Sequence, residues 1–164
     1  MPTFLPSPHS FLSHIFHTLE TLKIDVSRLE LDHVCYRVET WERYEVLKKM
    51  LETEAELLGE KMISGRPICT YKLKEPIRYE EREIWVLELP APKDGSPYQE
   101  GFEHVEFVID TSFEDFMQRY PHISFDTKAL GKAINPDIGI EYDGARVKFH
   151  QNSLEYVVRY LERD

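Results

Sequence analysis

The stretches LDHVCYRVET (residues 31–40) and FEHVEFVIDT (residues 102–111) follow one template: acid, His, Val, any residue, aromatic, any residue, branched aliphatic, acid, Thr. The two histidines, His33 and His104, are 104 − 33 = 71 residues apart. Each stretch runs into a segment with the apolar spacing of an amphipathic helix, so each predicts a strand followed by a helix. We therefore expect a duplicated module with a histidine at the same place in each half. If the halves pack about a pseudo-twofold axis, the two imidazoles can converge.

Composition limits the class of protein. A chain of 164 residues that is 41% hydrophobic can build one globular domain with a normal core. Its formal net charge of −10, from 20 basic and 30 acidic residues, disfavours nucleic acid as a partner. We find no apolar run near the roughly 20 residues of a membrane span and no signal-peptide pattern, so we expect a cytoplasmic protein without a membrane partner. Two distant cysteines, Cys35 and Cys69, fit a reducing compartment.

Hydrophobic periodicity divides the single domain, 1–164, into three parts. Residues 1–30 form an N-terminal cap with a helix over about 8–23. The first module, 31–98, and the second, 99–164, share the order βαβββ, and a C-terminal helix ends the second. The expected elements of the first are a strand at 31–38, a helix at about 41–58 and strands near 62–64, 67–74 and 82–89. Those of the second are a strand at 103–109, a helix at about 113–120 and strands near 125–130, 138–142 and 145–150. Thr40 and Ser112 are the expected N-caps of the two module helices.

Strand parity separates two faces, because alternate side chains point to opposite sides of a sheet. One face is apolar and should pack on the helices; among others, it includes Val34, Phe107 and the set Trp85, Leu87 and Leu89. The opposite face is rich in charge and imidazole: His33, Cys35, Arg37, Lys72, Glu88, His104, Glu106, Arg146, Lys148 and His150. This polar face either lines a cavity or is solvated, as is common in antiparallel sheets. The matched histidines favour the cavity.

The segments HVCYR (33–37), ELPAP (88–92), EHVEF (103–107) and VKFH (147–150) resemble the YecM family. The paired βαβββ order, with a histidine on the first strand of each module, resembles the wider vicinal-oxygen-chelate superfamily of glyoxalase I, extradiol dioxygenases and bleomycin-resistance proteins. The resemblance covers roughly residues 8–164. It implies an α+β fold in which the two modules form an incomplete mixed β-barrel with flanking helices and an N-terminal helix.

The resemblance also implies a divalent metal held by the first and last strands of each module. Carried over by position, His33 and Glu88 are the ligands from the first module and His104 is a ligand from the second. The last strand lacks the usual glutamate, and His150 is its one plausible ligand. Glu106, two residues beyond His104, could take that place or act as the catalytic base.

Two imidazoles and a carboxylate suit Zn, Fe, Mn, Ni or Co. On the same parity, Arg37, Lys72 and Arg146 could neutralise a carboxylate or phosphate of a small-molecule substrate. Each residue also has a purely structural interpretation. His33 and His104 could be hydrogen-bonded core histidines, Glu88 and Glu106 could be ion-pair partners of the arginines, and His150 could lie on the surface.

Two classes of function follow. The first is a metal-dependent isomerase, lyase or dioxygenase acting on a small, oxygen-rich anion in a cavity between the modules. The second is a non-catalytic protein of the same fold that binds or sequesters a small ligand. An interaction module using the acidic surface is a weaker third alternative. Pairing of modules across subunits is common in the superfamily, so a homodimer is possible.

Overall fold

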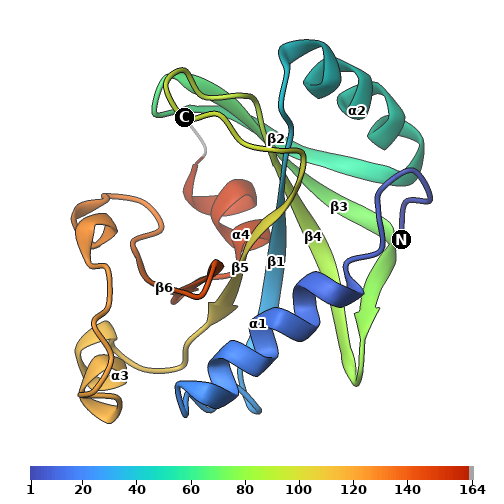
Figure 1. Ribbon diagram of the computed structural model, residues 1–164. Coiled ribbons are helices and arrows are strands. Elements are labelled where there is room, and N and C mark those ends of the chain that lie inside the picture. The colour runs from blue at the N-terminus through green and yellow to red at the C-terminus, as the bar shows by residue number, and fades with distance from the viewer. Residues whose placement is uncertain (163–164) are drawn as a thin grey trace.

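The part of the polypeptide that the structure describes forms one mixed β-sheet of seven strands with four α-helices, the first of them near the N-terminus (Figure 1). The computed structural model describes residues 1–162. The strand order is β2-β3-β4-β1-β5-β7-β6. The strands are β1 (Glu30–Arg37), β2 (Ala55–Ile63), β3 (Arg66–Tyr79), β4 (Arg82–Pro90), β5 (Gly101–Val108), β6 (Asp137–Tyr142) and β7 (Ala145–His150). The predicted α+β class is confirmed, while the sheet is open, with β2 and β6 at its edges.

The two halves of the chain meet at the centre of the sheet, where β1 and β5 pair antiparallel. Each central strand also pairs parallel with the last strand of its own half, β1 with β4 and β5 with β7. The halves therefore extend outward from the centre in the same order. This arrangement places the repeated segments, 31–40 and 102–111, side by side.

Three helices cover one face of the sheet, namely α1 (His9–Thr21), α2 (Trp41–Glu54) and α3 (Phe113–Arg119). The core lies between them and the sheet, and Phe116 of α3 packs on Phe149 of β7 with ring centroids 4.7 Å apart. The Thr40 hydroxyl accepts a hydrogen bond from the Arg43 backbone N–H, and that of Ser112 accepts one from the Asp115 N–H. Both predicted N-caps are thus confirmed.

The second half has one strand fewer than predicted. Residues 125–130 form no strand; a single bridge joins Asp126 to Gly139, and a 3-10 turn (η1, Lys128–Gly131) follows. The Asp126 carboxylate accepts a hydrogen bond from the Lys128 N–H, which is a local turn that competes with strand pairing.

Two predictions about the first half were also wrong. The helix predicted over about 41–58 ends at Glu54, since Ala55 has an extended backbone and pairs with Leu73. Trp85 is 38% exposed rather than packed on the helices, and Ile84 is buried instead. The pairing of β3 with β4 shifts register between Lys72 and Ile77, which changes the parity at this point.

The other face of the sheet carries a cavity of about 640 Å³. A short C-terminal helix, α4 (Leu154–Tyr156), and a π-helical turn (η2, Val157–Leu161) contribute Leu154 and Val158 to its wall. His33, Cys35, Arg37 and Glu88 line the cavity, as parity predicts. The polar face of the sheet is therefore concave. No helix among residues 1–162 has the length and apolar character that crossing a membrane requires.

Candidate metal centre

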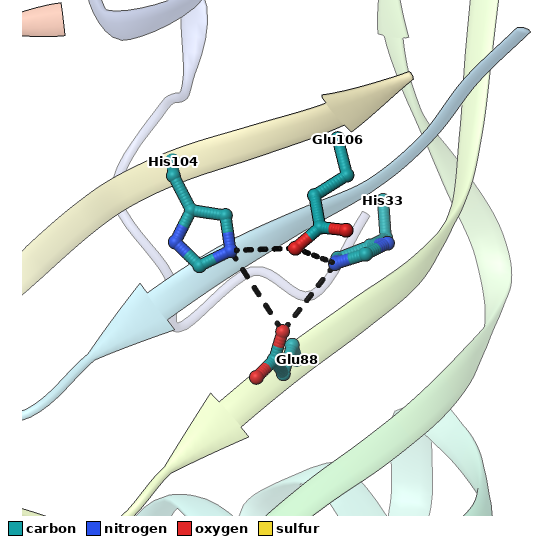
Figure 2. A group of neighbouring side chains, drawn as sticks. All are labelled: His33, Glu88, His104 and Glu106. Atoms are coloured by element: carbon teal, nitrogen blue, oxygen red, sulfur yellow. Dashed lines mark ion pairs between the residues drawn. The ribbon is translucent and has the colours of Figure 1, made fainter. Parts of the chain in front are cut away.

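Four side chains from three neighbouring strands converge on the floor of the cavity (Figure 2). They are His33 of β1, Glu88 of β4, and His104 and Glu106 of β5, each offering a ligand atom within 4.8 Å of the others. His33 Nε2 lies 3.3 Å from Glu88 Oε2 and 3.7 Å from Glu106 Oε1. His104 Nε2 lies 3.9 Å and 3.4 Å from the same two oxygens. The repeated histidines thus face one another across two carboxylates.

An acid precedes each histidine in sequence and contacts its other ring nitrogen. Asp32 Oδ2 lies 2.7 Å from His33 Nδ1, and Glu103 Oε2 lies 3.2 Å from His104 Nδ1. Because metal-binding histidines commonly donate their second N–H to a carboxylate, this contact fixes the tautomer that leaves Nε2 free.

Neighbouring residues of a regular strand point to opposite faces, so these contacts need a local irregularity. Leu31 and His33 pair with the consecutive residues Phe107 and Glu106, which leaves Asp32 as an extra residue on β1. Cys35 and Tyr36 pair with His104 and Phe102, which leaves Glu103 as an extra residue on β5. Each acid is therefore the extra residue of a β-bulge, a feature that re-aims side chains beside functional sites.

The Nε2 atoms of His33 and His104 are buried and have no hydrogen-bond partner of good geometry among residues 1–162. Leaving a buried polar atom unpaired costs about 1–3 kcal/mol, so two such atoms aimed at one point require an explanation. Ligands bound to one metal at about 2.1 Å lie about 3.0–3.4 Å apart in octahedral or tetrahedral geometry. The observed separations, 3.3 to 3.9 Å, fit such a metal after small side-chain adjustments.

The cluster carries an excess of negative charge. Burial lowers the pKa of His33, but the carboxylates of Glu106, Asp32 and Glu88 together have the larger effect and raise the pKa to about 10. Burial raises the pKa of Glu106, and Lys148 and the surrounding imidazoles lower it well below the usual value. Lys148 and the protonated His33 therefore supply positive charge to these carboxylates, and a divalent metal bound there would supply it in place of the His33 proton.

Register identifies which residue replaces the usual glutamate of the second half. In the first half, Cys35, two residues past His33, pairs with Glu88 of β4. In the second half, Glu106, two residues past His104, pairs with Lys148 of β7. Lys148 therefore occupies the place equivalent to Glu88, and its Nζ lies 3.2 Å from Glu106 Oε1.

Comparison with known proteins shows the family of this chain. The family model described as YecM protein matches residues 4–134. This chain belongs to the YecM family. Protein YecM of Escherichia coli (strain K12) is 30% identical over 171 aligned residues, which cover 91% of this chain and 89% of that protein.

Solved structures extend the comparison to the fold. A structural-genomics structure, Protein EC4020, has a TM-score of 0.72 and 31% identity, covering 94% of this chain and 90% of its own. The methylmalonyl-CoA epimerase of Mycobacterium tuberculosis has a TM-score of 0.51 and 16% identity, covering 74% of this chain and 87% of its own. At that identity the similarity shows the fold alone. The predicted family, and its place among proteins of the vicinal-oxygen-chelate fold, are confirmed.

His150 lies behind the four-residue cluster rather than in it. Its ring is fully buried, with Nε2 3.2 Å from Asp32 Oδ2 and Nδ1 3.3 Å from Glu106 Oε2. It therefore links the carboxylate that orients His33 to the carboxylate that faces both histidines. The structure brings Glu106, and not His150, within reach of the other three predicted ligands.

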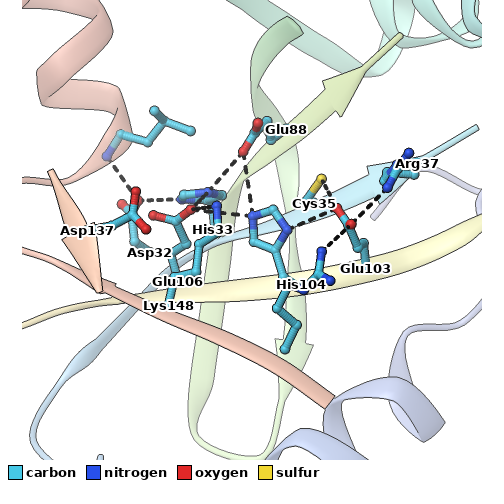
Figure 3. A network of polar contacts seen from close by, with 12 residues as sticks. Asp32, His33, Cys35, Arg37, Glu88, Glu103, His104, Glu106, Asp137 and Lys148 are labelled. Carbon is cyan, nitrogen blue, oxygen red and sulfur yellow. Dashed lines mark hydrogen bonds and ion pairs between the residues drawn. The ribbon is translucent and has the colours of Figure 1, made fainter. Parts of the chain in front are cut away.

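The three cations predicted to bind substrate each have a carboxylate partner, and Figure 3 shows that of Arg37. Arg37 and Arg146 both contact Glu103 Oε1, at 3.0 and 2.8 Å, from the wall of the main cavity. Lys72 lies in a separate pocket with Asp32 and Trp85, where it pairs with Glu155 at 2.7 Å. In this structure the three cations form ion pairs with glutamates of the protein.

Sequence reasoning assigned no role to Asp32 and Glu103, although both precede a repeated histidine. The signal was present, because the template begins with an acid in both halves. Strict parity would have placed these carboxylates on the opposite face from the histidines.

Proposed function

We propose that this YecM-family protein binds one divalent transition metal through His33, Glu88, His104 and Glu106, and acts as an enzyme on a small oxygen-rich anion. One observation carries the proposal: two imidazole Nε2 atoms from equivalent strands, buried and without hydrogen-bond partners among residues 1–162, face the same two carboxylates. We assign the fourth ligand to Glu106 rather than to His150, since His150 lies behind it.

Two imidazoles and two carboxylates suit Zn, Fe(II), Mn, Ni or Co, so the donor set narrows the metal to this group. A metal bound there would supply Lewis-acid polarisation of neighbouring substrate oxygens. The fold of the methylmalonyl-CoA epimerase structure supports an enzyme of this general type.

The chain's own residues would hold and orient the reacting molecule. Asp32 and Glu103 fix the two imidazoles, as their contacts at Nδ1 indicate. Glu106 is also the carboxylate placed to move a proton at the substrate, with Lys148 beside it to stabilise developing negative charge. The cavity, about 640 Å³, has the size of a small-molecule site.

A non-catalytic binding protein is the second candidate, and the surroundings of Glu106 favour it. Both carboxylate oxygens of Glu106 are engaged, Oε1 with Lys148 at 3.2 Å and Oε2 with His150 at 3.3 Å. A carboxylate held in this way is a weak base, so the cavity could retain a ligand without changing it.

Metal analysis by element of the freshly purified protein tests the metal site. We expect about one equivalent of a transition metal per chain, lost in both His33→Ala and His104→Ala. His17→Ala is the matched control, since His17 is exposed on α1 and should keep the metal. A wild-type protein that stays metal-free after incubation with Zn, Fe(II), Mn, Ni and Co in turn would overturn the proposal.

Turnover separates the two candidates once the metal is established. The enzyme hypothesis predicts that a panel of small hydroxy, keto and dihydroxy acids contains a molecule converted by the loaded protein and not by His104→Ala. Saturable binding of such a molecule without conversion would instead support the binding protein.

A further inference from the structure

One part of the cavity wall carries cations that form no ion pair within the part of the chain that the structure describes. Lys61, Arg66 and Lys93 line the cavity, and none has a carboxylate oxygen within ion-pair distance among residues 1–162. This differs from Arg37 and Lys148, which each contact a glutamate. Three cations without a direct ion-pair partner in one wall are unexpected in a chain with a net charge of −10.

Arg66 is the best-fixed of the three. It begins β3 directly after a turn in which Ser64 and Gly65 both have positive φ, 51° and 81°, as a tight hairpin requires. Its Nη1 donates a hydrogen bond to the Ala91 carbonyl at 2.8 Å, which holds the guanidinium from one side. The position of the side chain is therefore set by two segments, the β2–β3 hairpin and the end of β4.

A second donor of Arg66 is not satisfied within residues 1–162. Its Nε is buried and has no hydrogen-bond partner among the described residues. A guanidinium offers five N–H donors, and an unpaired buried donor is costly, so an acceptor is expected at this point of the cavity. Burial lowers the pKa of Arg66, and the nearby charge of Arg37 lowers it further. An anion placed there would compensate both effects.

We propose that Arg66 is the anchor for an oxyanion, a carboxylate or phosphate group, of the ligand that this cavity binds. The planar fork of a guanidinium matches the oxygens of either group. Lys61 and Lys93 add positive charge to the same wall. This inference rests on the proposed metal site, because it assigns the second end of the same ligand.

Register separates this anchor from the metal centre along the cavity. Thr70 of β3 pairs with Glu88, and Arg66 is four residues earlier on the same, cavity-lining face. At about 3.3 Å per residue, their Cα positions are about 13 Å apart, and the long Arg66 side chain shortens that span. The ligand is therefore a small bifunctional molecule, with neighbouring oxygens at one end and an oxyanion at the other.

Anion binding to metal-free protein tests the anchor independently of the metal. The full chain is stripped with EDTA and titrated with inorganic phosphate and, separately, with malonate. The readout is the side-chain Nε–H signal of Arg66 in a ¹⁵N correlation spectrum, assigned by its absence in Arg66→Lys. The matched control is Arg78→Gln, since Arg78 lies on the same strand but is exposed and paired with Glu83.

We expect saturable shifts of the Arg66 signal with at least one of the two anions, and the anion that binds identifies the group as phosphate or carboxylate. Affinity, measured for every variant by isothermal titration calorimetry, should fall at least about ten-fold in Arg66→Gln and be unchanged in Arg78→Gln. Arg66→Lys, which keeps the charge, should bind at intermediate strength. An Arg66 signal that neither anion moves, or equal binding by Arg66→Gln, would overturn the anchor while leaving the metal analysis unaffected. If wild-type protein took up none of the five metals while the Arg66 signal still responded to an anion, the metal proposal would fall and the anchor would stand.

Discussion

The two halves of the site place their proposed carboxylate ligands on different strands. In the first half, the first strand offers Cys35 and the fourth strand offers Glu88, paired in register. In the second half, the first strand offers Glu106 and the last strand, β7, offers Lys148, again paired in register. Neighbouring strands lie about 4.8 Å apart, so a carboxylate on either one reaches the same point between the histidines. The duplication therefore preserves the position of the carboxylates in space better than their position in sequence.

The carboxylates behind the two histidines are also held differently. Asp32 is shared by His33, His150 and the backbone N–H of Leu154, which donates to it at 2.9 Å. Glu103 is shared by His104 and two arginines, Arg37 and Arg146. One acid thus belongs to a chain of imidazoles, while the other balances fixed positive charge. We expect the first to matter more for the metal and the second more for stability.

Substitutions of Glu106 and Lys148, the charged pair of the second half, should produce the largest change in metal affinity. Glu106→Gln removes a proposed ligand, so its affinity for Zn or Co should fall at least about 100-fold. The double variant Glu106→Cys with Lys148→Glu copies the Cys35 and Glu88 pattern of the first half. It should recover most of the affinity, measured by titration against a competing chelator.

The control for this exchange is Lys148→Gln alone, which keeps all four proposed ligands and should bind at least as well as wild type. Circular dichroism checks that every variant is folded. A double variant as weak as Glu106→Gln would show that the positions of Glu88 on β4 and Lys148 on β7 are not interchangeable.

Neutralising the two supporting acids should separate stability from metal affinity. In Glu103→Gln the nearly buried Arg37 loses its carboxylate, and breaking a buried ion pair costs about 3–5 kcal/mol. We expect a loss near the lower limit, about 3 kcal/mol in the free energy of unfolding by urea, since Arg37 keeps its hydrogen bond to the Ser96 carbonyl and its stacking on Tyr98.

Metal affinity should follow the reverse order. Asp32 contacts His33 Nδ1 at 2.7 Å, whereas Glu103 contacts His104 Nδ1 at 3.2 Å. Loss of such a supporting carboxylate weakens metal binding by about 10–100-fold, so Asp32→Asn should lie near the upper limit and Glu103→Gln near the lower. Equal losses of affinity and of stability in both variants would erase the distinction between the two halves.

Much of the fold could be predicted because it depends on patterns that can be recognised in the sequence itself. The repeated template identified the two central strands, and alternation along β7 assigned Val147 and Phe149 to the core and Lys148 to the cavity, as observed. The caps Thr40 and Ser112 were also readable, since an N-cap is a local interaction within four residues.

The parts that could not be predicted depend on partners distant in sequence. The extra residues Asp32 and Glu103 are defined only by the pairing of β1 with β5, and nothing in either strand alone marks a bulge. The equivalence of Lys148 and Glu88 likewise requires the register of two parallel pairs. The missing strand at 125–130 was lost to a turn at Asp126, whose local hydrogen bond outweighed an apolar pattern.

The smallest predicted effect tests how far the repeat extends. In the template, Thr111 is the counterpart of Thr40, but the structure caps α3 with Ser112, one residue later. Thr40→Ala and Ser112→Ala should therefore each lower the free energy of unfolding by about 1 kcal/mol. Thr111→Ala should change it by less than about 0.5 kcal/mol, since its hydroxyl donates only to the neighbouring Ser112 carbonyl. Urea unfolding of the three variants measures all of these values. If Thr111→Ala were as costly as Thr40→Ala, the sequence repeat would describe the caps better than the observed geometry does. The expected result instead ends the structural repeat at the acids before the threonines, Glu39 and Asp110. After these acids, the second half has one residue more than the first before its helix begins.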